Sequence, residues 1–197
     1  MVLLTALSLL MATLQTQTLK SDFTFTVTAN QSQPMTYNGA VTMQGERFMF
    51  QMLSMEAAYD GKTLYIYQEE TDELTLSNPT QEELSETNPF YMAKTLMPLC
   101  NVTERESKSG EEVYITLTPK QQTSNGAMNR EMGKLTMMKD LVSLTVKVRK
   151  ADNMPLSMEL REKQQTSSLR MTNPRYVKEN VVWVVNKPNA FVNDLRE

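Results

Sequence analysis

The sequence predicts a mainly β (α+β) fold: a strongly curved antiparallel sheet of about ten strands, forming an incomplete, half-open β-barrel with a short helical lid. Three observations support this prediction. Several segments alternate apolar and other residues with a period of two, most clearly Asp22–Ala29. The pair Asp60-Gly61, set between β-forming residues, is typical of a tight turn. Between Pro89 and Pro98 the spacing of apolar residues becomes helical, which interrupts the strands.

The strands are predicted in order along the chain. After Asp22–Ala29, alternation resumes over Tyr37–Met43 and, beyond a turn or bulge at Gly45, over Phe48–Met52. Leu64–Tyr67 is apolar or aromatic on both faces, so it needs core on one side and a lid or ligand on the other. The remaining strands are expected at Glu73–Ser77, Glu112–Thr118, Lys134–Met138, Ser143–Val148, Pro155–Arg161, Ser167–Thr172 and Val181–Val185.

The helical interruption has recognisable start and stop signals. Thr80 and Glu83 have the spacing of a capping box. A second start follows at Pro89, since proline suits the first turn of a helix, and Pro98 ends the run. Apolar residues at helical spacing lie between them, and we interpret 89–97 as a movable lid with an apolar stripe of Phe90, Ala93 and Met97.

Residues 1–18 allow two interpretations. Val2–Leu14 is apolar on all sides and too short to span a membrane. It fits the apolar region of a secretion signal peptide, or a first helix that packs on the sheet and ends near Gln17. Residues 19–197 are predicted to form a single domain. In both cases we expect a chain that works outside the cytoplasm.

Composition excludes several classes of function. A net charge of −3 without a basic block argues against nucleic acid as a partner. The absence of histidine removes Ser-His-Asp schemes and histidine-ligated metals. Cys100 is the single cysteine, so no intrachain disulfide can form, and we expect a buried, inert thiol. The acidic residues lie in predicted loops. We therefore expect no enzyme activity, no metal and no cofactor.

What remains is apolar surface. One face of the predicted sheet is too wide for a single short helix to cover. Either the sheet closes into a packed barrel, or it stays open and its mouth holds an acyl chain, with about 0.8 kcal/mol gained per buried methylene. The 16 methionines suit a surface that adapts to variable apolar partners, or they fill the core. The predicted inward residues are Phe23, Phe25, Val27, Tyr37, Val41, Met43, Phe48, Phe50, Met52, Leu64, Ile66, Leu74 and Leu76.

The order of motifs from about Leu19 onward resembles the LolA family, the periplasmic carriers of outer-membrane lipoproteins. The most specific pieces are Asp-Gly-Lys-Thr-Leu at 60–64 and Thr-Pro-Lys at 118–120. The terminal Asp-Leu-Arg and the methionine-rich strands look like the Bacteroidetes branch. The other matching pieces are Leu19–Phe23, Gly39–Met43, Arg47–Phe50, Asn88–Phe90, Tyr114–Leu117 and Asp194–Arg196.

The resemblance implies a half-barrel whose cavity takes acyl chains of lipoproteins from an inner-membrane transporter and passes them to an outer-membrane acceptor. It implies a periplasmic protein that performs no chemistry, and we expect a monomer. Phe90 and Met97 of the lid would join the inward residues of the sheet in lining the acyl-chain cavity. The alternatives are a lipoprotein-sensing regulatory module and a structural surface domain on the same fold.

One departure from the family concerns release of the cargo. Family members often carry a basic residue on the strand before the conserved phenylalanine, and Gln44 stands at that place here. Arg47 is the nearest cation, but an offset of three on one extended strand points it to the opposite face, unless Gly45 forms a bulge. Gln44 and Arg47 are therefore the residues predicted to be linked to release.

Overall fold

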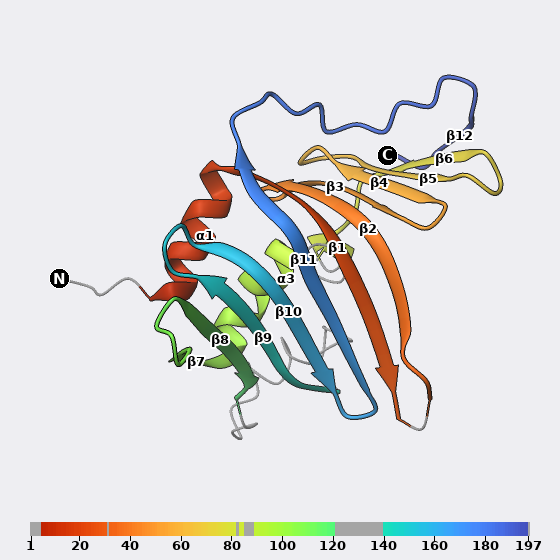
Figure 1. Cartoon of the computed structure of the whole chain (residues 1–197). Coiled ribbons are helices and arrows are strands. Elements are labelled where there is room, and N and C mark those ends of the chain that lie inside the picture. The colour runs from red at the N-terminus through yellow and green to blue at the C-terminus, as the bar shows by residue number, and fades with distance from the viewer. Residues whose placement is uncertain (1–4, 31, 82, 85–88, 121–139, 197) are drawn as a thin grey trace.

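The chain forms one large, open sheet that curves around two helices (Figure 1). The computed structural model describes residues 5–30, 32–81, 83–84, 89–120 and 140–196. Within these residues the sheet has 12 strands in the order β12-β6-β5-β4-β3-β2-β1-β11-β10-β9-β8-β7. All neighbouring strands are antiparallel except β12 and β6, which are parallel. The predicted fold class is confirmed.

The strands form two meanders that meet in the middle of the sheet, where β1 pairs with β11. The predicted strand Lys134–Met138 lies outside the described residues. The strands are β1 (Thr18–Ala29), β2 (Met35–Gln44), β3 (Arg47–Met52), β4 (Met55–Tyr59), β5 (Leu64–Gln68), β6 (Glu73–Ser77), β7 (Cys100–Glu106), β8 (Glu112–Pro119), β9 (Leu141–Arg149), β10 (Met154–Glu162), β11 (Gln165–Val177) and β12 (Phe191–Asp194).

The N-terminal segment contains helix α1 (Ala6–Thr16). Thr5 caps its first turn by accepting a hydrogen bond from the backbone N–H of Ser8 at 3.2 Å. The helix presents three buried leucines at helical spacing, and they join the main core on the concave side of the sheet; they are Leu7, Leu10 and Leu14. In the structure, this segment is thus a helix that packs on the sheet.

The turns of the first meander follow local chemistry. At the predicted Asp60-Gly61 turn, one carboxylate oxygen of Asp60 accepts hydrogen bonds from the backbone N–H groups of Lys62 and Thr63, each at 2.8 Å. Gly61 adopts a φ of +104°, which only glycine adopts readily. The turn therefore forms as predicted and fixes where β5 begins.

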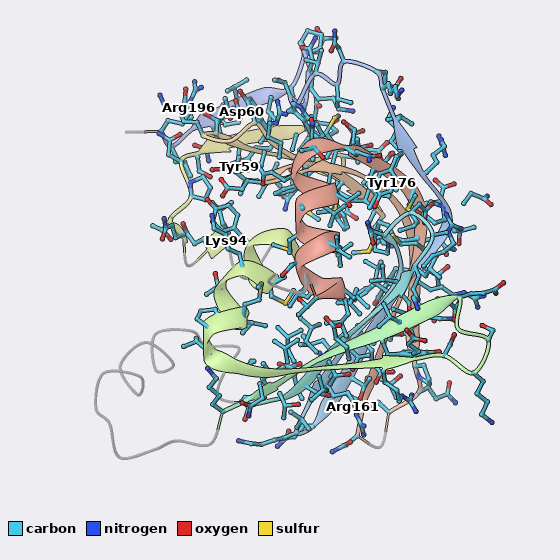
Figure 2. All side chains as sticks on the ribbon, turned by 90° about the vertical axis from the view of Figure 1, so that its left-hand side faces the viewer. Tyr59, Asp60, Lys94, Arg161, Tyr176 and Arg196 are labelled. Carbon is cyan, nitrogen blue, oxygen red and sulfur yellow. The ribbon has the colours of Figure 1, made fainter. Side chains whose placement is uncertain are left out.

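The helical interruption also begins as predicted. The N–H of Glu83 donates to the hydroxyl of Thr80 at 3.3 Å, and the N–H of Thr80 donates to the carboxylate of Glu83 at 2.7 Å, which completes a capping box. Helix α3 (Pro89–Leu96) follows and continues into the short 3-10 helix η1 (Met97–Leu99). Both α1 and α3 lie on the concave side of the sheet (Figure 2).

The C-terminal segment after β11 corrects two predictions. Residues 178–190, which we call the strap, cross the convex face near β3–β6 (Figure 1). The predicted strand Val181–Val185 is wrong, because this part of the strap is extended without belonging to a sheet. Its alternation has another cause: Trp183 and Val185 are buried, while Val182 is exposed.

The prediction that Leu74 and Leu76 face inward is also wrong. Both leucines pack with Val185 of the strap on the convex face. The register places them opposite Tyr67 and Tyr65, whose side chains belong to the same convex cluster. Strand β5 is apolar on both faces, so its pattern does not show which face is concave. The period of two therefore could not decide whether the leucines of its partner β6 point to the concave or the convex side.

Candidate functional site

A cavity of about 460 Å³ opens on the concave side of the sheet. Strands from both meanders and helix α3 contribute to its wall. The lining residues are Phe23, Phe25, Val41, Met43, Phe48, Phe50, Met52, Met55, Ala57, Leu64, Ile66, Met92, Met158, Leu160, Ser167 and Leu169.

Strand periodicity places these side chains together. Phe23 and Phe25 are two residues apart on β1, so they point to the same face. The ring of Phe23 stacks on that of Phe50 from β3, with 5.4 Å between ring centroids. Gly39 on the intervening β2 makes this possible, because a β-carbon there would lie 2.4 Å from the ring of Phe23. The missing side chain of Gly39 thus lets one aromatic ring reach across a strand to the next.

The chemistry of the lining is almost entirely apolar. Among the described residues, Ser167 is the single polar residue of the lining, and no charged residue lines it. The described part of the chain holds no group of acidic, histidine or cysteine side chains that could bind a metal ion. Cys100 is buried away from this lining, and burial raises the pKa of its thiol, which keeps it protonated and unreactive. The described lining therefore suits an apolar ligand.

Methionine is prominent in the wall. Unbranched thioether side chains have several low-energy conformations, so they fit irregular apolar shapes better than leucine or valine. A methionine-rich wall can therefore follow ligands of different length and branching. The five methionines of the lining are Met43, Met52, Met55, Met92 and Met158.

Most of the residues predicted to line a cavity are found in this wall. They are Phe23, Phe25, Val41, Met43, Phe48, Phe50, Met52, Leu64 and Ile66. Val27 and Tyr37 lie on the same sheet face as Phe25 but outside the lining: Val27 is two residues further along β1, and Tyr37 is directly opposite Phe25 on β2. Met97 packs against the main core instead. Phe90 lies in α3, and its side chain is outside the described part of the structure.

Several lining residues were missed from the sequence. Met158, Leu160 and Leu169 occupy alternate positions on strands that were predicted, so the period of two could have indicated them. Met55 and Ala57 belong to β4, a five-residue strand that was not predicted because it has no strong β-forming pattern. Met92 was missed because the helical face was assigned to Ala93 and Met97 instead.

Helix α3 closes one side of the cavity and is tied to the sheet by one acidic residue. Met92 and Leu96, four residues apart, are its buried face. At the turn between β2 and β3, the carboxylate of Glu46 accepts hydrogen bonds from the hydroxyl of Tyr91 at 3.0 Å and the ammonium of Lys94 at 2.9 Å. The hydrogen bond from Lys94 is the main reason why the pKa of Glu46 is lowered. Figure 2 labels Lys94 on this helix.

Gln44 and Arg47 do not line the cavity. They face each other across the two-residue turn between β2 and β3, and the guanidinium of Arg47 donates to the side-chain oxygen of Gln44 at 2.8 Å. Arg47 was expected to point to the opposite face from Gln44 if both lay on one continuous strand. This expectation does not apply, because the chain reverses at Gly45. The amide of Gln44 also donates to the carbonyl of Thr16 at 3.1 Å. Arg47 lies over the ring of Trp183 in the strap.

Comparison with known proteins gives similarity of structure without similarity of sequence. No family model and no curated relative matches the sequence. An uncharacterized conserved protein from Thermus thermophilus is 12% identical and has a TM-score of 0.54, with 96% of each chain covered. This likeness extends over nearly the whole length of both chains and shows that they share a fold.

Two further solved structures are more distant. A LolA-superfamily protein from Nitrosomonas europaea is 10% identical, with a TM-score of 0.43 over 89% of this chain and 95% of the other. A putative outer membrane lipoprotein-sorting protein domain from Vibrio parahaemolyticus is 7% identical, with a TM-score of 0.41 over 86% of this chain and 90% of the other. In the described part of this chain, neither helix is both long and apolar enough to cross a membrane.

Proposed function

We propose that this chain is a periplasmic carrier that binds acyl chains of lipoproteins in its concave cavity and moves them from the inner to the outer membrane. The observation that supports it best is a cavity of about 460 Å³ whose lining, as far as the structure describes it, has Ser167 as its single polar residue. The proposed partners are an inner-membrane lipoprotein-releasing transporter and an outer-membrane acceptor. Residues 19–197 would act as one carrier domain, as a monomer and without catalysis.

The absence of charge in the wall fits this cargo. A phospholipid headgroup held inside the cavity would call for a cation or several hydrogen-bond donors, and the described lining offers neither. An apolar wall instead recognises tails alone, at about 0.8 kcal/mol per buried methylene. Whatever the tails are attached to stays outside. A carrier of lipid-anchored proteins needs this property, because the attached proteins differ from one cargo to the next.

Helix α3 would act as the movable lid of the carrier. Its buried face rests on the core through Met92 and Leu96, while the contacts to Glu46 lie at the rim of the sheet. Polar contacts at a rim open at little cost, because water replaces them. Met92 is itself part of the wall, so a ligand in the cavity would contact this helix directly.

The test is binding of a fluorescent fatty acid to the purified chain, together with native mass spectrometry for lipid that co-purifies. Met158→Gln places an amide of similar length in the wall, and burying an amide costs about 1–3 kcal/mol. We expect about tenfold weaker binding of the probe or more. Met35→Gln is the matched control, because Met35 is 53% exposed and outside the lining. Absence of probe binding by the unmodified chain would refute the proposal.

A further inference from the structure

The turn between β3 and β4 contains a leucine in an unusual backbone conformation. Leu53 has a φ of +54°, in the left-handed region that bulky side chains rarely adopt. It is followed by Ser54, and Met52 pairs with Met55, so the hairpin has a two-residue loop. Ser54 has no positive φ, and when only the first position of a two-residue loop has one, that position is normally glycine. Leu53 is also 69% exposed, so packing does not compensate for the strain.

The preceding hairpin shows what the fold itself requires. Between β2 and β3 the corresponding loop position is Gly45, with a φ of +57°. A β-carbon at Gly45 would lie 3.2 Å from the side-chain amide of Gln15 in α1. At the second hairpin, glycine would satisfy the backbone equally well. A strained and exposed leucine there does not serve folding, and this points to a role outside the folded core.

The position of Leu53 relates it to the cavity. Its neighbours Met52 and Met55 both line the cavity, so the tip of this hairpin continues the wall outward. The tip is also held firmly, because the carbonyl of Ser54 accepts a hydrogen bond from the backbone N–H of Glu69 at 2.9 Å. Leu53 is thus presented to solvent on a braced turn at the edge of the ligand site.

We propose that Leu53 inserts into the surface of a lipid bilayer and brings the cavity against the membrane while an acyl chain passes. A specific protein–protein interface needs a broad patch, whereas burial of one leucine side chain in a bilayer is favourable and suits the brief contact of a transfer step. The adjacent β5–β6 turn carries the exposed acids Glu69 and Glu70, so attraction to anionic lipid does not contribute. The contact is apolar. This inference rests on the proposed function for its purpose, but not for the membrane contact itself.

The experiment measures transfer of the fluorescent fatty acid cis-parinaric acid from the full chain to phosphatidylcholine vesicles. Leu53→Gly should slow this transfer about tenfold, by the loss of one buried leucine contact. It should leave the affinity of the cavity for the probe unchanged, because Leu53 is not in the lining. It should also raise the midpoint of thermal unfolding, since glycine relieves the strain. Leu53→Met should transfer at nearly the normal rate.

The control is Leu195→Gly, which removes a leucine that is 59% exposed at the far, C-terminal end of the chain and should change nothing. Unchanged transfer by Leu53→Gly would overturn the proposal, and so would a parallel loss of probe affinity, which would make Leu53 part of the cavity. Normal transfer to vesicles combined with a defect confined to a protein acceptor would overturn it too.

Flotation with vesicles of the protein without bound probe separates the proposed membrane contact of Leu53 from the proposed carrier function. If flotation depends on Leu53 while no probe binds, the membrane contact stands and the carrier function fails.

Discussion

The two faces of strands β2–β6 are covered in different ways. On the convex face, the chain covers its own sheet: Val185 of the strap packs on Ala58, Leu74 and Leu76. On the concave face, alternate residues of β2–β5 line a cavity that α3 covers only in part. The same pattern of apolar residues therefore forms a closed core on one side and a binding surface on the other. The difference lies in the cover, and the strands themselves do not indicate it.

The attachments of the two covers differ as well. The strap is held by a buried tryptophan, by Arg47 over its ring at 5.2 Å, and by an ion pair of 2.7 Å between Lys187 and Glu56. Helix α3 is held by its buried face, Met92 and Leu96, and at the rim by Glu46. We propose that the strap stays in place while α3 moves. Substitutions on the two faces should therefore separate stability from ligand binding.

The largest effect on stability is expected on the convex face, at Trp183. Trp183→Ala should lower the free energy of unfolding by about 3–5 kcal/mol, because the indole is only 7% exposed and the fold leaves nothing to fill its place. Denaturant unfolding measures this. Probe binding by the folded fraction should be unchanged. Val182→Ala, at a neighbour that is 75% exposed, should stay within about 0.5 kcal/mol of the unmodified chain. Equal losses for the two variants would mean that the strap is not fixed to the sheet.

A smaller loss of stability with a larger loss of binding is expected on the concave face, at Phe50. Phe50→Ala removes the stacking on Phe23 but faces space that is already empty, so the cost should be about 1–2 kcal/mol. Probe affinity should fall about tenfold, because the ring is part of the wall. Denaturant unfolding and probe titration give the two numbers. A large loss of stability with unchanged binding would show a closed core in place of a ligand cavity.

The smallest effect is expected at the attachment of the lid. Because the folded pKa of Glu46 lies below its ordinary value of 4.5, the attachment contributes fully above about pH 4.5 and is lost as the pH falls through the lowered pKa. Acidification should lower hydrogen-exchange protection factors in α3, while addition of lipid at neutral pH should raise them. Glu46→Gln should weaken protection at neutral pH by an amount typical of exposed ion pairs, about 0.2–1 kcal/mol.

The matched control for the lid is Glu111→Gln, at an exposed acid between β7 and β8. It should leave the protection factors of α3 unchanged at every pH. If Glu46→Gln and the unmodified chain respond identically to acid, then Glu46 does not fasten the lid.

Sequence reasoning succeeded where local chemistry decides the outcome. The turn at Asp60-Gly61, the capping box at Thr80 and the bounds of β6 follow from neighbours in the chain, and each was predicted. The inward alternation of Phe23 and Phe25 was also sufficient to place them in the wall. In these cases, one residue type had a single favourable solution.

The failures occurred where tertiary cover decides. Alternation reports which side chains are buried and does not report whether the backbone pairs, so the strap resembles a strand because Trp183 and Val185 alternate with exposed residues. Leu74 and Leu76 could face either side of the sheet, and only the position of the strap decides between them. Gln44 and Arg47 were placed on one strand, although Gly45 separates two strands.

The pairing of β1 with β11 also bears on how the molecule is assembled in time. Thr18 pairs with Val177, so the seam at the centre of the sheet joins segments from nearly opposite ends of the sequence. Each meander can form from local hairpins, but the seam cannot close until both exist. Contacts of such high sequence separation make folding slow, and until closure the unpaired edges of β1 and β11 are exposed to aggregation.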